Sequence, residues 1–234
     1  MPLPAPVRSA AEFAFRTAGA RFRSSKRVTR WVFGLELTSR ERPVLWDLAL
    51  LALRAELPRA IGDVRRVLEV GTGEVGVLSL VVARALPSLD VHAVDVNPQF
   101  VDCAHENAVQ NGAQVRFFVS DLFSDVTGRY DVIFSAPPYV PRAWGDAHRH
   151  RGGDPECVWD GGEDGLDVVR RLATDAPAHL APGGRLLIAT SDFYHRPDEV
   201  RPAFEGYHVE SRRPSAWNPT RLWVLTRAPS GDPR

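Results

Sequence analysis

The 234-residue sequence has few features that would tie it to a membrane, a disulfide framework or a nucleic acid. Its only two cysteines, Cys103 and Cys157, form no Cys-x-x-Cys pair, which favours a reducing compartment and a cytoplasmic location. No apolar run reaches the ~18 residues that a membrane-spanning helix needs. The formal net charge is zero, so no overall field draws the chain to nucleic acid, although a local patch is compatible with this balance. The histidines are scattered, and no metal site is predicted.

The composition is that of a folded globular chain, with 44% hydrophobic and 25% charged residues. Its length allows one domain with a substantial core and a small appendage. Residues 1–30 contain seven basic residues and one acid, together with Pro2, Pro4 and Pro6. The prolines and the lack of a central apolar stretch favour a loose tail and a short helix over a targeting presequence.

Strand and helix patterns alternate along most of the chain. A helix is predicted at 10–23, a short strand or hairpin at 31–37, and a helix at 44–57 that ends before Pro58. Further strands are predicted at 67–70, 91–95, 115–119, 132–135, 185–190, 207–213 and 221–227, and helices at 75–86, 98–111, 166–180 and 196–204, with a long loop at 137–165. This alternation predicts an α/β fold: a doubly wound, mostly parallel sheet whose last two strands form an antiparallel edge hairpin.

The most informative segment is Val-Leu-Glu-Val-Gly-Thr-Gly-Glu-Val-Gly at residues 67–76. An apolar strand there contains Glu69 and leads into a Gly-x-Gly-x-x-Gly turn. The turn includes Gly71, Thr72, Gly73 and Gly76, with two residues between Gly73 and Gly76. Glycines permit positive φ and let backbone N–H groups approach a ligand closely. A second apolar strand ends nineteen residues later at Asp95, where a carboxylate can accept both hydroxyls of a ribose. Together they predict a nucleoside-binding site.

The acids around the turn favour S-adenosyl-L-methionine over a dinucleotide. Glu69 stands two residues before the first glycine, where it can reach the amino and sulfonium side of the ligand. A dinucleotide pyrophosphate prefers a turn without that negative charge. Ser120-Asp121-Leu122 follows the third strand, in a position suited to the adenine amino group. A nicotinamide oxidoreductase is the alternative, and Glu69 together with the Ala-Pro-Pro-Tyr run at 136–139 speaks against it.

These motifs in combination resemble those of the class I methyltransferases, and within them the Asn-Pro-Pro-Tyr group typified by the HemK-type protein-glutamine methyltransferases. The matching segments are 67–76, 92–97, 120–123, 135–141, 159–166 and 181–188. The resemblance implies a transferase with a seven-stranded Rossmann-like sheet and S-adenosyl-L-methionine as its cofactor. The residues placed at the cofactor are Glu69, Gly71, Thr72, Gly73, Gly76, Asp95, Val96, Asn97, Asp121, Leu122 and Ala136.

The same resemblance places methyl transfer at residues 136–139. In the Asn-Pro-Pro-Tyr group, the Asn oxygen and the first Pro carbonyl accept the two hydrogens of an NH₂ group, and the Tyr ring flanks the acceptor. The catalytic residues implied here are Ala136, Pro137 and Tyr139. The protein mainly has to hold the acceptor lone pair about 3 Å from the methyl carbon and in line with the S–C bond. Two consecutive prolines keep the Pro137 carbonyl rigid.

Ala136 stands where the family has its Asn. Losing a hydrogen bond at such a site costs on the order of 2–4 kcal/mol in the transition state. We therefore expect an acceptor more reactive than an amide, and N-methylation of a small molecule or peptide by proximity-driven in-line transfer. The alternatives are methylation of a protein glutamine or of an rRNA nitrogen, and use of the cofactor for a non-methyl reaction. The chain is also compatible with a homodimer, and gives no strong nucleic-acid or membrane signal.

The loop after the transfer motif offers several groups that could take up a proton, and the sequence does not choose among them: His148, His150, Asp146, Asp154, Glu156 and Asp160. Three tryptophans are candidate pocket walls, with core packing equally expected: Trp46, Trp144 and Trp159. In the HemK-type enzymes a helical domain that grips the release factor precedes the catalytic domain. Here about 30 residues precede the catalytic pattern. We expect residues 1–40 to form a tail, short helix and strand that cover the acceptor side, and residues 41–234 to form the catalytic domain.

Overall fold

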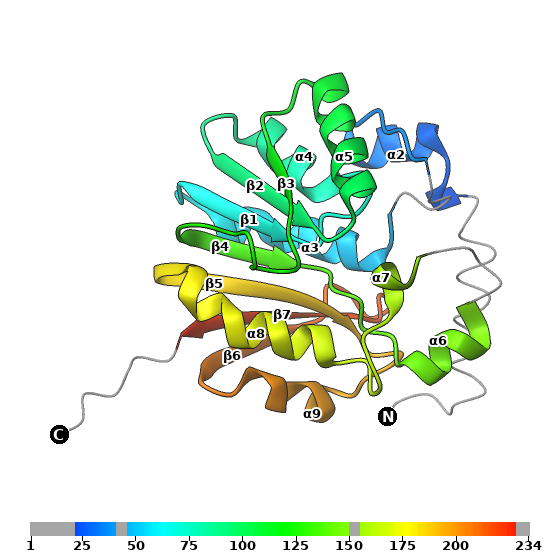
Figure 1. Ribbon diagram of the computed structural model, residues 1–234, viewed down its shortest axis with the longest axis vertical. Coiled ribbons are helices and arrows are strands. Elements are labelled where there is room, and N and C mark those ends of the chain that lie inside the picture. The colour runs from blue at the N-terminus through cyan, green and yellow to red at the C-terminus, as the bar shows by residue number, and fades with distance from the viewer. Residues whose placement is uncertain (1–21, 41–45, 150–154, 228–234) are drawn as a thin grey trace.

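The computed structural model describes residues 22–40, 46–149 and 155–227. A central twisted sheet has helices on both faces (Figure 1). Most of the helix predicted at 10–23 lies outside the described residues. Within the described ranges, no helix is both long and apolar enough to cross a membrane.

Seven strands form the sheet: β1 Arg66–Val70, β2 Asp90–Asp95, β3 Arg116–Val119, β4 Tyr130–Ser135, β5 Leu180–Ser191, β6 Tyr207–Arg212 and β7 Thr220–Arg227. Their order is β3-β2-β1-β4-β5-β7-β6. Strands β1 to β5 pair in parallel, and β7 runs antiparallel to both β5 and β6. The predicted doubly wound sheet with an antiparallel terminal hairpin is confirmed.

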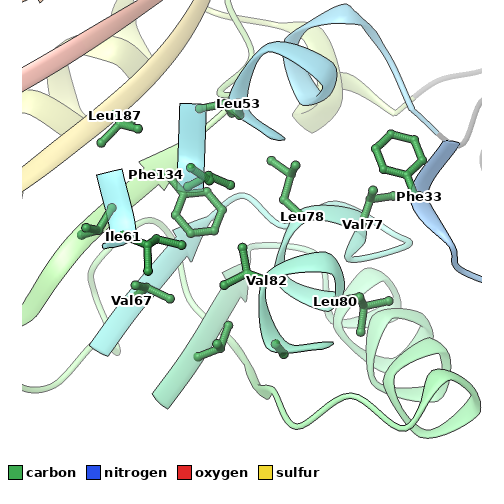
Figure 2. Close-up of a cluster of buried hydrophobic side chains, with 14 of the residues drawn as sticks. Phe33, Leu53, Ile61, Val67, Val77, Leu78, Leu80, Val82, Phe134 and Leu187 are labelled. Atoms are coloured by element: carbon green, nitrogen blue, oxygen red, sulfur yellow. The ribbon is translucent and has the colours of Figure 1, made fainter. Parts of the chain in front are cut away.

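The helices are α2 Lys26–Phe33, α3 Leu48–Ile61, α4 Val77–Ala85, α5 Pro98–Asn111, α6 Arg142–Arg149, α7 Glu156–Trp159, α8 Asp167–His179 and α9 Pro197–Val200, followed by the 3₁₀ helix η1 Arg201–Phe204. Helices α3, α4 and α5 cover one face of the sheet, and α8 and α9 cover the other (Figure 1). Because consecutive strand side chains point to opposite faces, β1 contributes to two cores. On one face, Val67 belongs to the same core cluster as Leu78 of α4 (Figure 2). On the other face, Leu68 belongs to the cluster that contains Leu172 of α8.

The strand predicted at 31–37 is wrong, because α2 continues to Phe33 and residues 34–37 belong to no strand. Ser25 caps this helix by accepting a hydrogen bond from the N–H of Val28 at 3.4 Å, and Gly34 ends it at φ +69°. A segment without regular secondary structure follows at residues 35–39 and binds side chains of α5. There the side-chain amide of Asn107 binds both the N–H and the carbonyl of Thr38, as a neighbouring strand would.

Other boundaries differ from the prediction as well, and β5 begins at Leu180 where the strand was predicted from 185. Helix α3 begins at Leu48, after Asp47 accepts the N–H of Leu50 at 3.0 Å, and it continues through Pro58 to Ile61. A proline interrupts one backbone hydrogen bond of a helix, and α3 ends within one turn of it. The long loop predicted at 137–165 contains two short helices, α6 and α7.

Candidate active site

The candidate site lies at the carboxyl edge of the parallel strands, between β1 and β4. The chain winds from β1 to β2 and β3 on one side and from β4 to β5 on the other, so these two strands flank the reversal of strand order. Ligands of open α/β sheets bind at such reversals. The Ser135 hydroxyl donates to the carbonyl of Val70 at 2.7 Å, which links the two strand ends just before they separate.

The glycine turn folds back onto the end of β2. The N–H groups of Gly71 and Thr72 both donate to the carbonyl of Val94, at 2.8 and 2.9 Å. Gly71, Gly73 and Gly76 all have positive φ. A Cβ at Gly71 would meet no atom within 4 Å, so that backbone is open to a ligand. A Cβ at Gly76 would lie 3.2 Å from that of Ala104, so this glycine is needed for packing against α5.

Asp95 connects the glycine turn to the start of α5. One of its oxygens accepts the N–H of Gly73 at 2.8 Å, and the other accepts the N–H of Asn97 at 3.0 Å. The carboxylate is buried, yet it has further lone pairs for hydroxyl groups of a ligand. Val96, the next residue, is an apolar side chain that is 50% exposed at this edge. An acid beside an exposed apolar surface fits a ribose and an attached purine ring.

Glu69 lies under α4 and holds the turn from below. One carboxylate oxygen accepts the Thr72 hydroxyl at 2.9 Å, the N–H of Ser79 at 3.0 Å and also the Ser79 hydroxyl. It thereby caps α4, whose N-cap residue Gly76 has no side chain to do so. Burial raises the pKa of Glu69 to about 7, against the opposing effect of the hydrogen bonds from Ser79 and Thr72. The predicted contact between Glu69 and a ligand stays a prediction.

The predicted adenine-binding turn after β3 has an unusual backbone. Leu122, at φ +51°, is the one non-glycine residue with positive φ in the described part of the chain. Ser120 stabilises the turn by donating to the carbonyl of Leu122 at 2.9 Å and accepting the N–H of Asp125 at 3.1 Å. Asp121 forms an exposed 2.8 Å ion pair with Arg171 of α8. Strained backbone of this kind concentrates at ligand sites.

The transfer motif forms the loop that follows β4, and a hydrogen bond from another segment of the chain holds its backbone. Ala136 is half-buried and packs against the core under α4, while Pro137 is buried. The carbonyl of Tyr139 accepts a 2.7 Å hydrogen bond from Nε2 of His195, which follows β5. Gly165 fits against the same imidazole: a Cβ there would lie 2.9 Å from its Cε1 atom. His195 thus joins the ends of β4 and β5 to the glycine run before α8.

Three comparisons with known proteins agree with this geometry. Residues 46–147 match the family model of the methyltransferase small domain. The chain is 40% identical over 165 residues to the release factor glutamine methyltransferase of Deinococcus radiodurans, covering 66% of this chain and 56% of that protein. It is also 40% identical over 133 residues to the ribosomal protein uL3 glutamine methyltransferase of Bradyrhizobium diazoefficiens, covering 53% of this chain and 40% of that protein.

Among solved structures, a methyltransferase from Pyrococcus furiosus superposes with a TM-score of 0.64 at 21% identity, over 90% of this chain and 98% of that one. The chain is similar to the class I S-adenosylmethionine-dependent methyltransferases in its motifs and in its fold. It spans about half the length of the curated relatives that it matches. The residues at the carboxyl edge fit the cofactor of this class: an open glycine turn at Gly71, a buried acid at Asp95 and an exposed apolar side chain at Val96.

Aromatic side chains lie close to the loop that follows β4. Tyr194 contributes a ring whose centroid lies 5.9 Å from that of Tyr139 and 5.1 Å from that of Trp144. Trp144 thus lies near the transfer loop, and its role as a wall of an acceptor pocket stays a prediction. Trp159 is buried in the core, as is Trp46, whose N–H donates to Thr29 at 3.2 Å.

The candidate bases fall into two groups. Asp160 binds Arg142 at 2.9 Å and accepts the N–H of Gly162 at 2.8 Å, so it organises the loop. Asp146 and Glu156 are exposed. His150 and Asp154 lie outside the described residues, and the side chain of His148 is not described either. In the described ranges, no three His, Cys, Asp or Glu side chains gather as a metal site would require.

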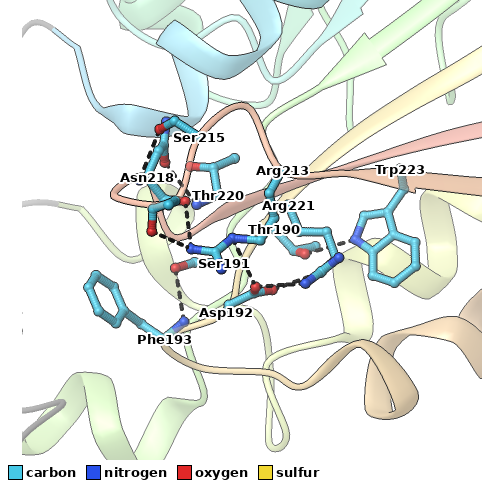
Figure 3. Close-up of polar contacts among 11 residues, drawn as sticks. Thr190, Ser191, Asp192, Phe193, Arg213, Ser215, Asn218, Thr220, Arg221 and Trp223 are labelled. Carbon is cyan, nitrogen blue, oxygen red and sulfur yellow. Dashed lines mark hydrogen bonds and ion pairs between the residues drawn. The ribbon is translucent and has the colours of Figure 1, made fainter. Parts of the chain in front are cut away.

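The loop after β5 is anchored to the β6–β7 connection. Asp192 forms a two-point ion pair with Arg221, at 2.8 Å for both contacts, and lies 3.6 Å from Arg213 (Figure 3). Asn218 accepts the N–H of Thr220 at 2.8 Å within the same network. This network fixes the segment that carries Tyr194 and His195. Our sequence analysis did not single out either residue, because neither belongs to a motif.

Proposed function

We propose that this methyltransferase methylates an amine nitrogen carried by a peptide or protein. The observation that carries the proposal is the Ser135–Tyr139 loop, which begins beside the end of β1 and has its Tyr139 carbonyl held by a buried histidine. Two relatives, named as glutamine methyltransferases of a release factor and of a ribosomal protein, support a protein acceptor. The absence of an amide side chain at position 136 favours an amine.

The residues of this chain would act mainly by positioning. S-adenosylmethionine, when bound, supplies a methyl group on a positively charged sulfur, which the acceptor lone pair displaces in line. Asp95 would accept hydrogen bonds from the ribose hydroxyls. The Pro137 carbonyl would accept a hydrogen bond from one N–H of the molecule that receives the methyl group. The Tyr139 ring would confine the acceptor from one side. The new N–C bond leaves the acceptor nitrogen positively charged, and its proton then passes to water. Orientation of this kind can supply a large part of the rate enhancement.

An amine needs less assistance than an amide at this site. An amide nitrogen shares its lone pair with the carbonyl, so two hydrogen-bond acceptors are needed to make it nucleophilic. Ala136 offers no side-chain acceptor, and the missing bond costs on the order of 2–4 kcal/mol in the transition state. A neutral amine has its lone pair available. The single carbonyl of Pro137 is enough to orient it.

Methylation of a protein glutamine is the second candidate, and the names of the relatives favour it. For this reaction another group would have to replace the missing Asn oxygen. A water molecule or a polar atom of the acceptor protein could fill the space beside Ala136. The two candidates differ in the atom that carries the new methyl group, so one experiment separates them.

The test is to incubate the purified protein with deuteromethyl S-adenosylmethionine and a protein extract, and to locate the label by fragment mass spectrometry. Label on lysine or amino-terminal nitrogens supports the proposal. Label on glutamine side chains supports the second candidate. Label confined to RNA or small molecules, or release of methylthioadenosine in place of S-adenosylhomocysteine, overturns both.

A matched pair of variants shows whether the label comes from this site. Tyr139→Leu removes the aromatic ring from the transfer loop, whereas Tyr207→Leu makes the same change at a ring whose hydroxyl donates to Ala173 at 2.7 Å, at the opposite edge of the sheet. We expect the first variant to change the labelling rate and the second to leave it unchanged. Equal effects of the two would count against transfer at the Ser135–Tyr139 loop.

A further inference from the structure

The outer face of α2 combines basic side chains with a tryptophan, and the methyl-transfer site uses none of them. Four side chains on this face are exposed: Lys26, Arg27, Arg30 and Trp31. Trp31 is 83% exposed. The inner face packs against the protein through Val28, Thr29, Val32 and Phe33. The four outer side chains, together called the outer α2 face, therefore remain available to a partner.

The outer α2 face carries a concentrated positive charge. Helix α2 has no acidic residue. Lys26 and Arg27 form no ion pair with any residue in the described ranges. Arg30 pairs with Glu36 at 2.8 Å, but both side chains are more than half exposed, so water and salt weaken this pair. The zero net charge of the whole chain conceals this local excess, because Lys26, Arg27 and Arg30 stand together in a helix without an acid.

The position of Trp31 distinguishes the candidate partners. A helix that lies on a membrane buries its apolar side in lipid. Here the apolar side of α2 is already packed in the protein, so a lipid surface would meet the basic side with a single indole. An acidic protein segment could pair with the cations, but it would leave the flat indole face without a stacking partner. A nucleic acid satisfies both kinds of group, since phosphates bind cations and bases stack on aromatic rings.

We propose that the outer α2 face binds single-stranded nucleic acid, with Trp31 stacking on an unpaired base and Lys26 and Arg27 contacting the adjacent phosphates. Arg27 and Trp31 are one helical turn apart, as are Lys26 and Arg30, so the four form one continuous face. At 1.5 Å per residue they span about 8 Å, which matches one or two nucleotides. A double helix offers no open base face for the indole. The proposal is independent of the methyl acceptor.

The experiment is a fluorescence anisotropy titration of the full chain against a fluorescein-labelled 20-nucleotide RNA of mixed sequence at low salt. We expect a dissociation constant in the range of ~10⁻⁶ to 10⁻⁴ M, typical of nonspecific phosphate contacts. Trp31→Ala should weaken binding by about tenfold through loss of stacking. The double change Lys26→Gln and Arg27→Gln should reduce the slope of log K against log salt by about 1.4, for two lost phosphate contacts on a single strand.

Trp217→Ala is the matched control. Trp217 is also exposed, at 72%, but it lies in the β6–β7 connection. It should leave RNA affinity unchanged, and both tryptophan variants should keep the melting temperature of the parent. No binding at low salt, or equal losses with both tryptophan variants, would overturn the proposal. So would equal affinity for polyglutamate or for anionic vesicles, because either result would assign the face to an acidic protein or a lipid surface.

Discussion

The imidazole of His195 and the backbone carbonyl of Tyr139 are joined by a 2.7 Å hydrogen bond that ties the loop after β5 to the loop after β4. A carbonyl can only accept, so Nε2 of His195 carries the proton. Burial lowers the pKa of His195 below its usual value, against the opposing effect of the Tyr139 carbonyl and of nearby acids. The neutral imidazole is thus the form that holds the transfer loop.

Replacing His195 should reduce methyl transfer more than cofactor binding. His195→Gln retains an N–H donor and should keep most of the activity, whereas His195→Phe keeps the ring volume and loses the donor. We expect His195→Phe to lower kcat about tenfold or more, because a small displacement of positioning groups is costly. Calorimetric affinity for S-adenosylhomocysteine should stay the same. Rescue by Gln relative to Phe is the signature of the hydrogen bond.

His92 provides the control for that experiment. It is equally buried, and its Nδ1 lies 2.8 Å from the Tyr130 hydroxyl near the opposite edge of the sheet. His92→Phe should lower stability but leave the kcat of the folded fraction unchanged. A similar fall in kcat for both Phe variants would mean that His195 acts only through stability.

Asp95→Ala should weaken the binding of S-adenosylhomocysteine by roughly 1.5–3 kcal/mol, the value of hydrogen bonds to a charged acceptor. Part of this loss could come from the turn, since Gly73 would lose its partner. Asp95→Asn separates the two effects, because an amide oxygen can still accept from Gly73. Asp175→Ala, an exposed change on α8, is the control and should have no effect in calorimetry. Unchanged affinity in Asp95→Ala would refute the ribose assignment.

Ala136→Asn restores the side-chain oxygen that the related Asn-Pro-Pro-Tyr enzymes have. If the site resembles theirs, labelling of glutamine amides should rise by about 1.5 to 3 orders of magnitude, corresponding to the regained hydrogen bond. Labelling of amines should change little or fall. Fragment mass spectrometry of the same extract measures both products. An unchanged product pattern would show that position 136 does not face the acceptor.

Below about pH 7, buried histidines and the buried Glu69 should make stability depend on pH in opposite directions. Burial lowers the pKa of both His92 and His195 below 6.5, so below that pH the unfolded chain takes up protons that the folded chain excludes. Stability therefore decreases as the pH falls. Glu69 acts in the opposite direction. Its pKa is raised from 4.5 to about 7, so stability is lost as the pH rises across that interval, by on the order of 3 kcal/mol.

Two variants should separate the contribution of Glu69 to stability from that of the histidines, in urea unfolding measured from pH 5 to pH 9. Glu69→Gln should flatten the loss between pH 4.5 and 7, and its amide oxygen can still accept from Ser79. His195→Gln should remove part of the loss of stability that the histidines cause as the pH falls. If Glu69→Gln leaves the curve between pH 5 and 7 unchanged, the carboxyl group is not buried in the way described.

Much of the fold followed from local patterns. The strands β1, β2 and β4 are apolar segments that end in polar or glycine residues, and α5 was predicted with both of its ends, Pro98 and Asn111, because Pro98 and Gly112 mark them. The glycine turn and Asp95 were predicted together because parallel strands end at the same edge. Those features depend on neighbours in sequence.

The rest depends on contacts between distant segments. The segment 35–39 has strand-like residues, but side chains of α5 rather than another strand satisfy its backbone, as Asn107 does for Thr38. His195 is 56 residues from Tyr139, and no local signal connects the two. The sequence position of Glu69 predicted only a contact with a ligand. It did not predict that the Glu69 carboxylate also caps α4.

The most direct test of the whole account is a crystal structure with S-adenosylhomocysteine. The account predicts the ribose hydroxyls within about 3 Å of the Asp95 carboxylate, the adenine against Val96, and the thioether facing the Ser135–Tyr139 loop. A ligand bound elsewhere, or a crevice that accepts a nicotinamide dinucleotide and rejects S-adenosylhomocysteine, would contradict it.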